Sequence, residues 1–342
     1  MKYKKLFLKK KSVGIYSFHE LINLESLHYV KKNIGSDLND YIIDIKKILL
    51  QSQINLYEIR NLKNINFLDT IIFIDVANPD LILKKYNINC NKKILILKEP
   101  PVVEPKLWKK EVVIKYNYIF TYNKDFIKKF RNLSNIIFSL MPRNLDFNKF
   151  SFIKRNKKYC MFASNKISRG KGELYSERKK IINYFLKRKD DLFDLYGPNW
   201  NLNLFQIKNF VIKFYRLKKI RFWQGVTSKK LEAMSKYTFS FCYENIKNFN
   251  GYISEKIIDS MRAGCIPIYK GPKNVKDYIP ENSFIDASKF YSIDKLILYL
   301  ENITTSGIRK YQYNILKFLT TEASKHFSLR NFSKKILHIV NL

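Results

Sequence analysis

The sequence is poor in acidic residues and in glycine. Its 342 residues include 64 Lys and Arg but only 29 Asp and Glu, a formal net charge of +35, and 10 glycines. A disordered chain is excluded as the main state, because 46% of the residues are hydrophobic. The basic excess has two explanations. A base-composition bias of the coding gene favours Lys, Asn and Ile together, and a polyanionic partner selects basic residues for function.

Cysteine and histidine are also scarce. The four cysteines lie far apart in apolar contexts, and the four histidines form no pattern with them, so no metal-ligand spacing is present. We expect buried, reduced thiols of an intracellular protein. The cysteines are Cys90, Cys160, Cys242 and Cys265.

Long hydrophobic runs are missing as well. No run reaches the ~18 apolar residues that span a bilayer. The opening stretch MKYKKLFLKKKSVGIYSF is charged and has no apolar core of signal-peptide length. We therefore expect a cytoplasmic protein. Its lysines are spread along the chain, which favours peripheral contact with the inner face of an anionic membrane over a concentrated nucleic-acid patch.

The length favours two domains, and short apolar runs alternate with helical patterns in two blocks. Around residues 141–158 the periodicity stops, which indicates a linker. This pattern predicts an α/β protein with two doubly wound parallel sheets facing a central cleft. Strands are expected at 12–18, 54–59, 69–75, 92–100, 117–123, 159–165, 237–245, 265–271 and 283–290, and helices at 36–53, 124–132, 176–189, 229–237, 254–264 and 330–342.

The stretch GYISEKIIDSMRAGCIPIYKGP (251–272) carries the clearest site signal. The pattern predicts a helix capped by Ser254, with Glu255 and Lys256 in its first turn. Free N–H groups and the positive dipole end make such a terminus a seat for phosphate, to which Lys256 adds a full charge. The alternative is an ordinary surface helix, since Glu is favoured in a first turn anyway.

Two strand ends flank this helix. The strand after it ends in Gly271-Pro272, and the strand before it ends at Glu244-Asn245. Open α/β sheets bind ligands at the carboxyl edge of their strands. Polar groups from two adjacent strands at one edge therefore favour a binding site over a plain capped helix.

The stretch 237–290 resembles the donor-binding region of the α-1,3-fucosyltransferases, glycosyltransferase family 10. The ordered matches are Glu244-Asn245, Tyr252-Ile253-Ser254-Glu255-Lys256, Ala263-Gly264, Ile266-Pro267-Ile268, Gly271-Pro272, Asp277-Tyr278-Ile279-Pro280 and Ser283-Phe284-Ile285. Ser254 stands where the family usually has Thr, which keeps the capping hydroxyl.

Weaker matches extend the resemblance to roughly residues 95–290. YCMFASN followed by SERKKIINYF places the family's phosphate-binding arginine at Arg178, with Arg169 as the rival. LKEPP followed by NYIFTYNKD places the family's general base at Glu99, with Glu104 as the nearby competitor.

The resemblance implies a GT-B fold of two Rossmann-like domains and an inverting transfer of L-fucose from GDP-β-L-fucose. Residues 1–150 would bind the acceptor, residues 155–325 the donor, and 326–342 would form a C-terminal helix. The implied acceptor is a hydroxyl of a surface glycan that contains N-acetylglucosamine or glucose. The expected glycan is of lipopolysaccharide or capsule type, either free or attached to a lipid, and the expected product linkage is α-1,3.

The same resemblance implies the roles of the site residues. Lys256 and Arg178 neutralise the departing diphosphate, and Glu99 accepts the proton of the acceptor hydroxyl. Glu255 binds donor hydroxyls. Tyr252 stacks on or hydrogen-bonds the donor, or simply staples the helix entry, and Asn245 bonds a donor hydroxyl or caps the turn. We expect that transfer requires no metal or other cofactor, and that a divalent metal would at most increase the rate.

Two rival hypotheses stay open at this point. A GT-B transferase with another nucleotide sugar has the same strands, helices and phosphate residues. A non-catalytic protein that binds nucleic acid or acidic lipid suits the +35 charge, but it does not need the dense motif at 251–285.

Overall fold

The computed structural model describes residues 11–18, 40–133, 135–140, 142, 145, 155, 157–188, 190–200 and 220–342. The chain divides into an N-terminal unit, up to residue 142, and a C-terminal unit, up to residue 327; residues 328–342 belong to the N-terminal unit. The expected linker at 141–158 lies largely outside the described residues. None of the described helices combines the length and the hydrophobicity that a bilayer span needs.

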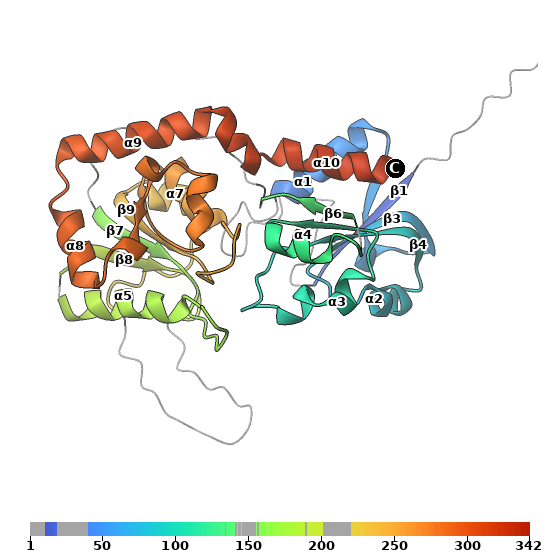
Figure 1. Cartoon of the computed structure of the whole chain (residues 1–342), viewed down its shortest axis with the longest axis horizontal. Helices are drawn as coiled ribbons and strands as arrows, with labels where there is room; N and C mark the ends of the chain where they lie inside the picture. Colours follow the sequence, from blue (N-terminus) through green and yellow to red (C-terminus); the bar gives the residue numbers. More distant parts are fainter. Residues whose placement is uncertain are drawn as a thin grey trace, which may run out of the picture. The chain divides into compact units, whose positions relative to one another are not determined.

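The N-terminal unit contains a six-stranded sheet with the order β2-β1-β3-β4-β5-β6 (Figure 1). All its strand pairs are parallel. The strands are β1 (Ser12–Ser17), β2 (Asn55–Glu58), β3 (Phe67–Ile74), β4 (Asn89–Ile96), β5 (Tyr118–Thr121) and β6 (Asn135–Phe138). The helices of this unit are α1 (Asp40–Gln51), α2 (Pro79–Tyr86), α3 (Lys110–Val113), α4 (Lys124–Phe130) and α10 (Leu329–Asn341), with short 3-10 turns η1 (Ile59–Asn61) and η2 (Pro105–Trp108).

Both faces of this sheet are covered, which explains the continuous apolar runs of β3 and β4. Along β3, Ile72 and Ile74 pack in one core cluster with residues of α1 and α10. Ile71 and Phe73 point to the opposite face and pack with residues of α3 and α4. Successive strand residues alternate between faces, so each run serves two cores at once.

The last helix, α10, packs on this N-terminal sheet. The Phe332 ring lies 5.5 Å from that of Phe120 in β5. The end of the helix is capped by two lysines: Lys11 Nζ donates to the carbonyl of Val340 at 3.0 Å, and Lys92 Nζ donates to that of Ile339 at 2.8 Å. Such cations satisfy the unpaired carbonyls at a helix C-terminus.

The C-terminal unit contains a five-stranded parallel sheet with the order β11-β10-β9-β7-β8. Its strands are β7 (Lys157–Phe162), β8 (Phe193–Tyr196), β9 (Tyr237–Tyr243), β10 (Ile266–Lys270) and β11 (Ile285–Asp286). The helices are α5 (Tyr175–Arg188), α6 (Lys230–Met234), α7 (Glu255–Arg262), α8 (Ile293–Glu301) and α9 (Thr305–Thr320); the 3-10 turns are η3 (Lys273–Asp277), η4 (Glu281–Ser283), η5 (Ala287–Lys289) and η6 (Glu322–Phe327).

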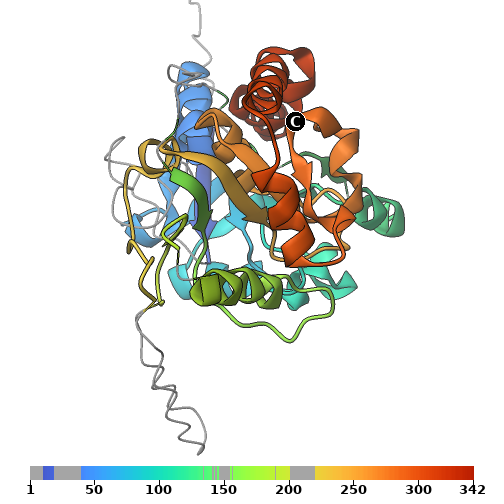
Figure 2. The ribbon, with the colours of Figure 1, turned by 90° about the vertical axis from the view of Figure 1, so that its left-hand side faces the viewer.

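The central strand β9 separates two layers of helices. Phe241 points toward α5, where its ring lies 6.2 Å from that of Phe185. Cys242 points to the other face, where its Sγ lies 3.2 Å from the carbonyl of Lys256 in α7. Figure 2 shows α5 on one side of this sheet, away from the helices that cover the other side. The predicted α/β class with two Rossmann-like units is confirmed.

Most of the predicted strands and helices among the described residues are confirmed to within a few positions. The strand expected over 283–290 is wrong in length, because β11 holds only two residues. Asp286 ends it: its Oδ1 accepts from Ser288 N at 2.9 Å and Oγ at 2.6 Å, a side-chain turn that competes with strand pairing. Cys160, Cys242 and Cys265 are buried and Cys90 is half-buried, all as free thiols.

Candidate functional site

The helix α7 begins as the sequence predicts. Ser254 is its N-cap, with extended backbone, and its Oγ accepts from the backbone N–H of Lys256 at 3.4 Å. Ile257, Ile258 and Met261 are fully buried, which anchors the helix on the sheet. Glu255 and Lys256 are therefore fixed in the first turn, where the positive end of the helix dipole lies.

Glu244, which directly follows β9, organises this helix start. Its side chain is completely buried. One carboxylate oxygen accepts from the backbone N–H of Ser254 at 2.7 Å, and the other accepts from the hydroxyl of Ser254 at 2.6 Å. From the sequence, Glu244 was predicted only as a polar strand end within the family match, without a role of its own. The signal was present, since a carboxylate directly after an apolar strand needs hydrogen-bond donors when it is buried.

The ammonium of Lys256 lies among oxygen atoms at the same point. Its Nζ is 2.9 Å from Ser254 Oγ, 3.4 Å from Glu244 Oε2 and 3.6 Å from Glu255 Oε1. The side chain is only 13% exposed. Partial burial lowers the local dielectric constant, so this charge interacts more strongly with a bound anion than a surface lysine would.

A second group of predicted residues joins this one through hydrogen bonds. Arg178 Nη2 donates to Asn245 Oδ1 at 2.8 Å and to the carbonyl of Tyr243 at 2.7 Å. Asn245 Nδ2 in turn donates to the hydroxyl of Tyr252 at 2.8 Å. The structure therefore brings Arg178, on α5, to the carboxyl edge of β9 beside the start of α7.

The two rival arginines differ in their surroundings. Arg178 is 4% exposed, whereas Arg169 is exposed in the segment before α5. Burial lowers the pKa of the Arg178 guanidinium, and the negative charges of Glu244 and Glu255 act in the opposite direction. Arg178 is thus electrostatically coupled to the same two carboxylates that surround Lys256.

Gly271 allows the strands to meet closely at this edge. A Cβ atom on it would lie 2.4 Å from Tyr269 Oη and 2.8 Å from Glu244 Cγ. Any side chain here would displace the buried carboxylate that holds Ser254, which explains the small residue after β10.

Glu99 belongs to the N-terminal unit and lies just after β4. It is half-buried. Its backbone N–H donates to Asp75 Oδ1 at 3.0 Å, and its carbonyl accepts from Trp108 Nε1 at 3.1 Å. Asp75 and Trp108 were not predicted as partners of Glu99. Asp75 carries the same signal as Glu244, a carboxylate directly after an apolar strand, whereas nothing in the linear order places Trp108 beside Glu99. Glu104, the competitor, is also half-buried and precedes η2.

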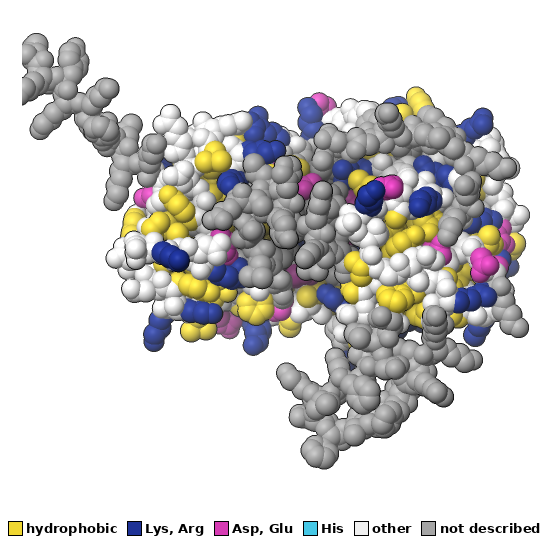
Figure 3. Space-filling model, turned by 180° about the vertical axis from the view of Figure 1, so that it is seen from behind, with side chains coloured by type: hydrophobic (Ala, Val, Ile, Leu, Met, Phe, Trp, Pro, Cys, Tyr) yellow, Lys and Arg dark blue, Asp and Glu magenta, His cyan; other side chains and the backbone are white. Residues whose placement is uncertain are grey.

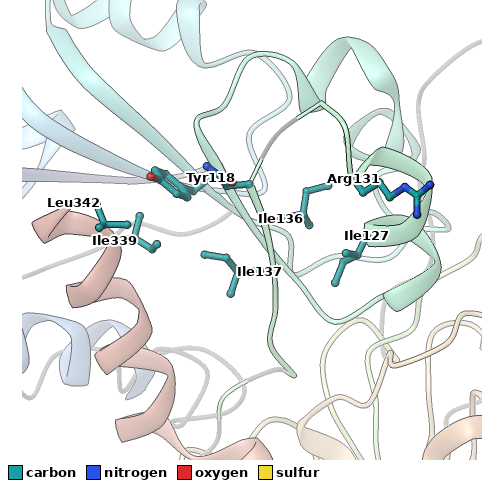
Figure 4. A pocket seen from close by; sticks show the side chains of 8 residues that line it. Tyr118, Ile127, Arg131, Ile136, Ile137, Ile339 and Leu342 are labelled. Atoms are coloured by element: carbon teal, nitrogen blue, oxygen red, sulfur yellow. The ribbon is translucent and has the colours of Figure 1, made fainter.

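The N-terminal unit also contains a cavity of about 420 Å³ (Figure 4). Tyr118 and Asn135, which line it, are the first residues of β5 and β6. The cavity is therefore at the amino edge of the sheet, whereas Glu99 follows the carboxyl end of a strand. Its other lining residues are mostly apolar: Ile127, Arg131, Ile136, Ile137, Ile339 and Leu342. We assign it no part in the site.

Metal-binding side chains do not gather in the described part of the chain: no three His, Cys, Asp or Glu residues there are arranged to hold an ion. Two cationic side chains, Lys256 and Arg178, lie near the start of α7.

Two relatives match parts of the chain. An α-(1,3)-fucosyltransferase of Helicobacter pylori is 37% identical over 110 residues, which are 32% of this chain and 23% of that protein. An α-(1,4)-fucosyltransferase of Arabidopsis thaliana is 35% identical over 82 residues, 24% of this chain and 20% of that protein. The matches thus span less than a quarter of these relatives' own length.

A solved structure and a family model agree with these matches. A crystal structure of an α1,3-fucosyltransferase with GDP is similar with a TM-score of 0.54 at 16% identity, over 100% of this chain and 93% of that chain. This likeness shows a shared fold. The model of glycosyltransferase family 10 (fucosyltransferase), C-terminal region, matches residues 154–325, half of the chain. The chain therefore belongs to glycosyltransferase family 10, the fucosyltransferase family.

Proposed function

We propose that this protein is an inverting fucosyltransferase that moves L-fucose from GDP-β-L-fucose to a hydroxyl of a glycan containing N-acetylglucosamine or glucose, with an α-1,3 linkage. The observation that carries the proposal is the assembly of Lys256, Arg178, Asn245 and Tyr252 at one sheet edge. These residues come from the family motif and from a helix far away in sequence, and hydrogen bonds and charge connect them.

The first half of the mechanism concerns the leaving group. As the bond between the anomeric carbon and the phosphate oxygen breaks, its electron pair leaves with GDP and the diphosphate gains negative charge. Fixed positive groups that meet this charge stabilise the transition state more than the ground state. Lys256, Arg178 and the N-terminus of α7 would supply them. They also make a metal unnecessary, so the proposal includes no required cofactor.

Glu255 has a separate role in this proposal. Of the three oxygen atoms around Lys256 Nζ, Glu255 Oε1 is the most distant, at 3.6 Å. A phosphate oxygen can replace it at the ammonium. The released carboxylate then accepts hydrogen bonds from hydroxyls of the donor sugar or ribose. Asn245 and Tyr252 would complete the donor contacts.

The second half of the mechanism concerns the acceptor. Its hydroxyl oxygen bonds to the anomeric carbon from the face opposite the phosphate, which inverts the configuration. Its proton must move to a base at the same time. Glu99 is the proposed base, because its main chain is held on both sides and a carboxylate is a competent acceptor at neutral pH.

The donor can be identified by thermal unfolding with a panel of nucleotide sugars, followed by product analysis. GDP-fucose is expected to raise Tm more than UDP-glucose, UDP-N-acetylglucosamine or GDP-mannose. At a concentration one hundred times its Kd, a ligand of the folded state increases the free energy of unfolding by about 2.7 kcal/mol. Transfer should persist in EDTA, and the product should show an α-1,3 linkage by NMR. Stabilisation and turnover by a UDP-sugar instead would favour a GT-B transferase with another donor.

We further propose that the enzyme is cytoplasmic and in peripheral contact with anionic lipid at the inner face of the membrane. Its acceptors would be intermediates of lipopolysaccharide or capsule synthesis, either free or attached to a lipid carrier. On the face shown in Figure 3, the described Lys and Arg side chains are scattered rather than gathered in one patch. Such a spread suits a diffuse anionic surface better than a nucleic-acid groove.

Vesicle co-sedimentation tests this contact. The protein is expected to bind vesicles that contain phosphatidylglycerol, since each well-placed basic residue contributes about 1 kcal/mol near an anionic surface. High salt should release it, because screening shortens the Debye length to about 3 Å at 1 M. Neutral phosphatidylcholine vesicles are the control. Equal binding to both kinds of vesicle, or none to either, contradicts the proposal.

A further inference from the structure

Asp75 ties together the ends of two strands in the N-terminal unit. It directly follows β3, is 4% exposed and has a left-handed backbone conformation with φ of 52°. Its backbone N–H donates to the carbonyl of Ile96 at 3.1 Å. Its Oδ1 accepts from the backbone N–H groups of Lys98 at 2.7 Å and Glu99 at 3.0 Å. The main chain that leaves β4 is therefore fixed by a single buried carboxylate.

Glu99 is held from its other side as well. The indole Nε1 of Trp108 donates to the carbonyl of Glu99 at 3.1 Å. Trp108 itself is packed edge-on against Phe126 of α4, with ring centroids 5.0 Å apart. Both backbone polar groups of Glu99 are thus bound to side chains from different elements. Proton transfer depends on such exact placement of the base, and a displacement of about 1 Å can cost a factor of about 10² in rate.

The charge of Asp75 is unusual for its position. Burial raises the pKa of Asp75 to about 7, and the negative charge of Glu99 adds to this rise, while Lys98 lowers it. Tyr116 is a second titratable group near Asp75. Burial raises the pKa of Tyr116, and the charge of Asp75 makes a smaller contribution to this rise. The Tyr116 hydroxyl donates to the carbonyl of Val76. A buried charge of this kind is costly. An asparagine could accept the same two backbone bonds without that cost, so the carboxylate calls for a reason beyond stability.

We propose that Asp75 is a positioning residue for Glu99: its ionised carboxylate holds the main chain of the base through the two backbone hydrogen bonds. The inference rests on the proposed function, in which Glu99 is the base. In the transfer step the acceptor oxygen bonds to the anomeric carbon, its proton moves to a Glu99 oxygen, and GDP leaves with the electron pair. Asp75 stays ionised throughout, and its two backbone hydrogen bonds keep the base in place while the proton moves.

The test follows GDP release from GDP-fucose with N-acetyllactosamine as the acceptor, across the neutral pH range. The wild-type rate should rise as pH increases through about 7, where Asp75 ionises. Asp75→Ala should lower kcat about 10²-fold through misplacement of the base, with KM for GDP-fucose unchanged. Asp75→Asn keeps the acceptor oxygen but not its charge, so it should lose only about tenfold, because hydrogen bonds to a charged acceptor are roughly twice as strong as those to a neutral one. It should also abolish the rise near pH 7.

Asp69→Asn is the matched control. Asp69 lies on β3 near its amino end, whereas Asp75 follows the carboxyl end of that strand. The Oδ2 of Asp69 accepts from the backbone N–H of Ser12 at 2.7 Å. It should leave the rate and the pH profile unchanged. The proposal would be overturned if Asp75→Asn kept the kcat and the pH profile of the wild type and Asp75→Ala kept its kcat.

Amide hydrogen exchange separates this inference from the proposed function. Exchange at Lys98 and Glu99 should quicken in Asp75→Ala and stay the same in Asp69→Asn, whatever the enzyme transfers. Unchanged exchange in Asp75→Ala would show that Asp75 does not hold the base. If the wild type releases no GDP with any donor sugar, the proposed function fails, and the exchange result still decides whether Asp75 positions Glu99.

Discussion

Lys256→Ala is expected to lower kcat for fucose transfer about 10³-fold, the upper range for loss of one group that stabilises developing charge. The reason is the position of its ammonium, only 13% exposed at the start of α7, where a diphosphate would gain charge. GDP should also bind more weakly, since GDP carries the same phosphates. Steady-state GDP release and calorimetric titration with GDP measure the two effects.

Lys276→Ala is the matched control for this variant. It removes the same charge from the same unit, but Lys276 is 60% exposed and pairs with Glu281 at 3.7 Å on the surface. It should change neither kcat nor GDP affinity. Thermal unfolding establishes that both variants are folded. Near-normal turnover in folded Lys256→Ala would reject the phosphate role and, with it, the assigned donor site.

Glu99→Gln is expected to lower kcat between about 10² and 10⁴-fold, the usual range for a general base. The amide keeps the size of the side chain and the main-chain bonds to Asp75 and Trp108, but it cannot take up the proton of the acceptor hydroxyl. Affinity for GDP should stay unchanged, because the proposed donor residues lie in the C-terminal unit. The same pair of assays applies, with GDP titration as the internal check on folding.

Two further variants make the Glu99 result specific. Glu111→Gln removes an equivalent charge from an exposed position on α3 and should have no effect. Glu104→Gln tests the nearby competitor. A large loss of kcat in Glu104→Gln with normal turnover in Glu99→Gln would move the base to Glu104. Loss of GDP affinity in Glu99→Gln with kcat intact would remove Glu99 from the proton-transfer step.

The start of α7 could be predicted because all its determinants are close in sequence. Ser254 caps the helix, and the apolar spacing of Ile257, Ile258 and Met261 sets its buried face. Both are local properties of the chain, governed by helix periodicity and by the unpaired N–H groups of the first turn. The same segment lies within residues 154–325, the part of the chain that matches the family model.

Arg178 could be placed only as one of two candidates. The family resemblance placed the arginine at Arg178 and left Arg169 as the rival. The structure distinguishes them through contacts with Tyr243 and Asn245, residues more than sixty positions away along the chain. Contacts at this separation depend on how α5 crosses the sheet, which local periodicity does not encode.

The sequence alone therefore determined the alternation of strands and helices, the capped helix with Glu255 and Lys256, and the family. Each of these follows from neighbouring residues or from an ordered motif. Only the tertiary structure decided that the carboxylate of Glu244 holds Ser254 and Lys256, and that Asp75 and Trp108 hold Glu99. The physical reason is that parallel strands bring their carboxyl ends to one edge, so side chains that are distant in sequence become partners only when the sheet forms.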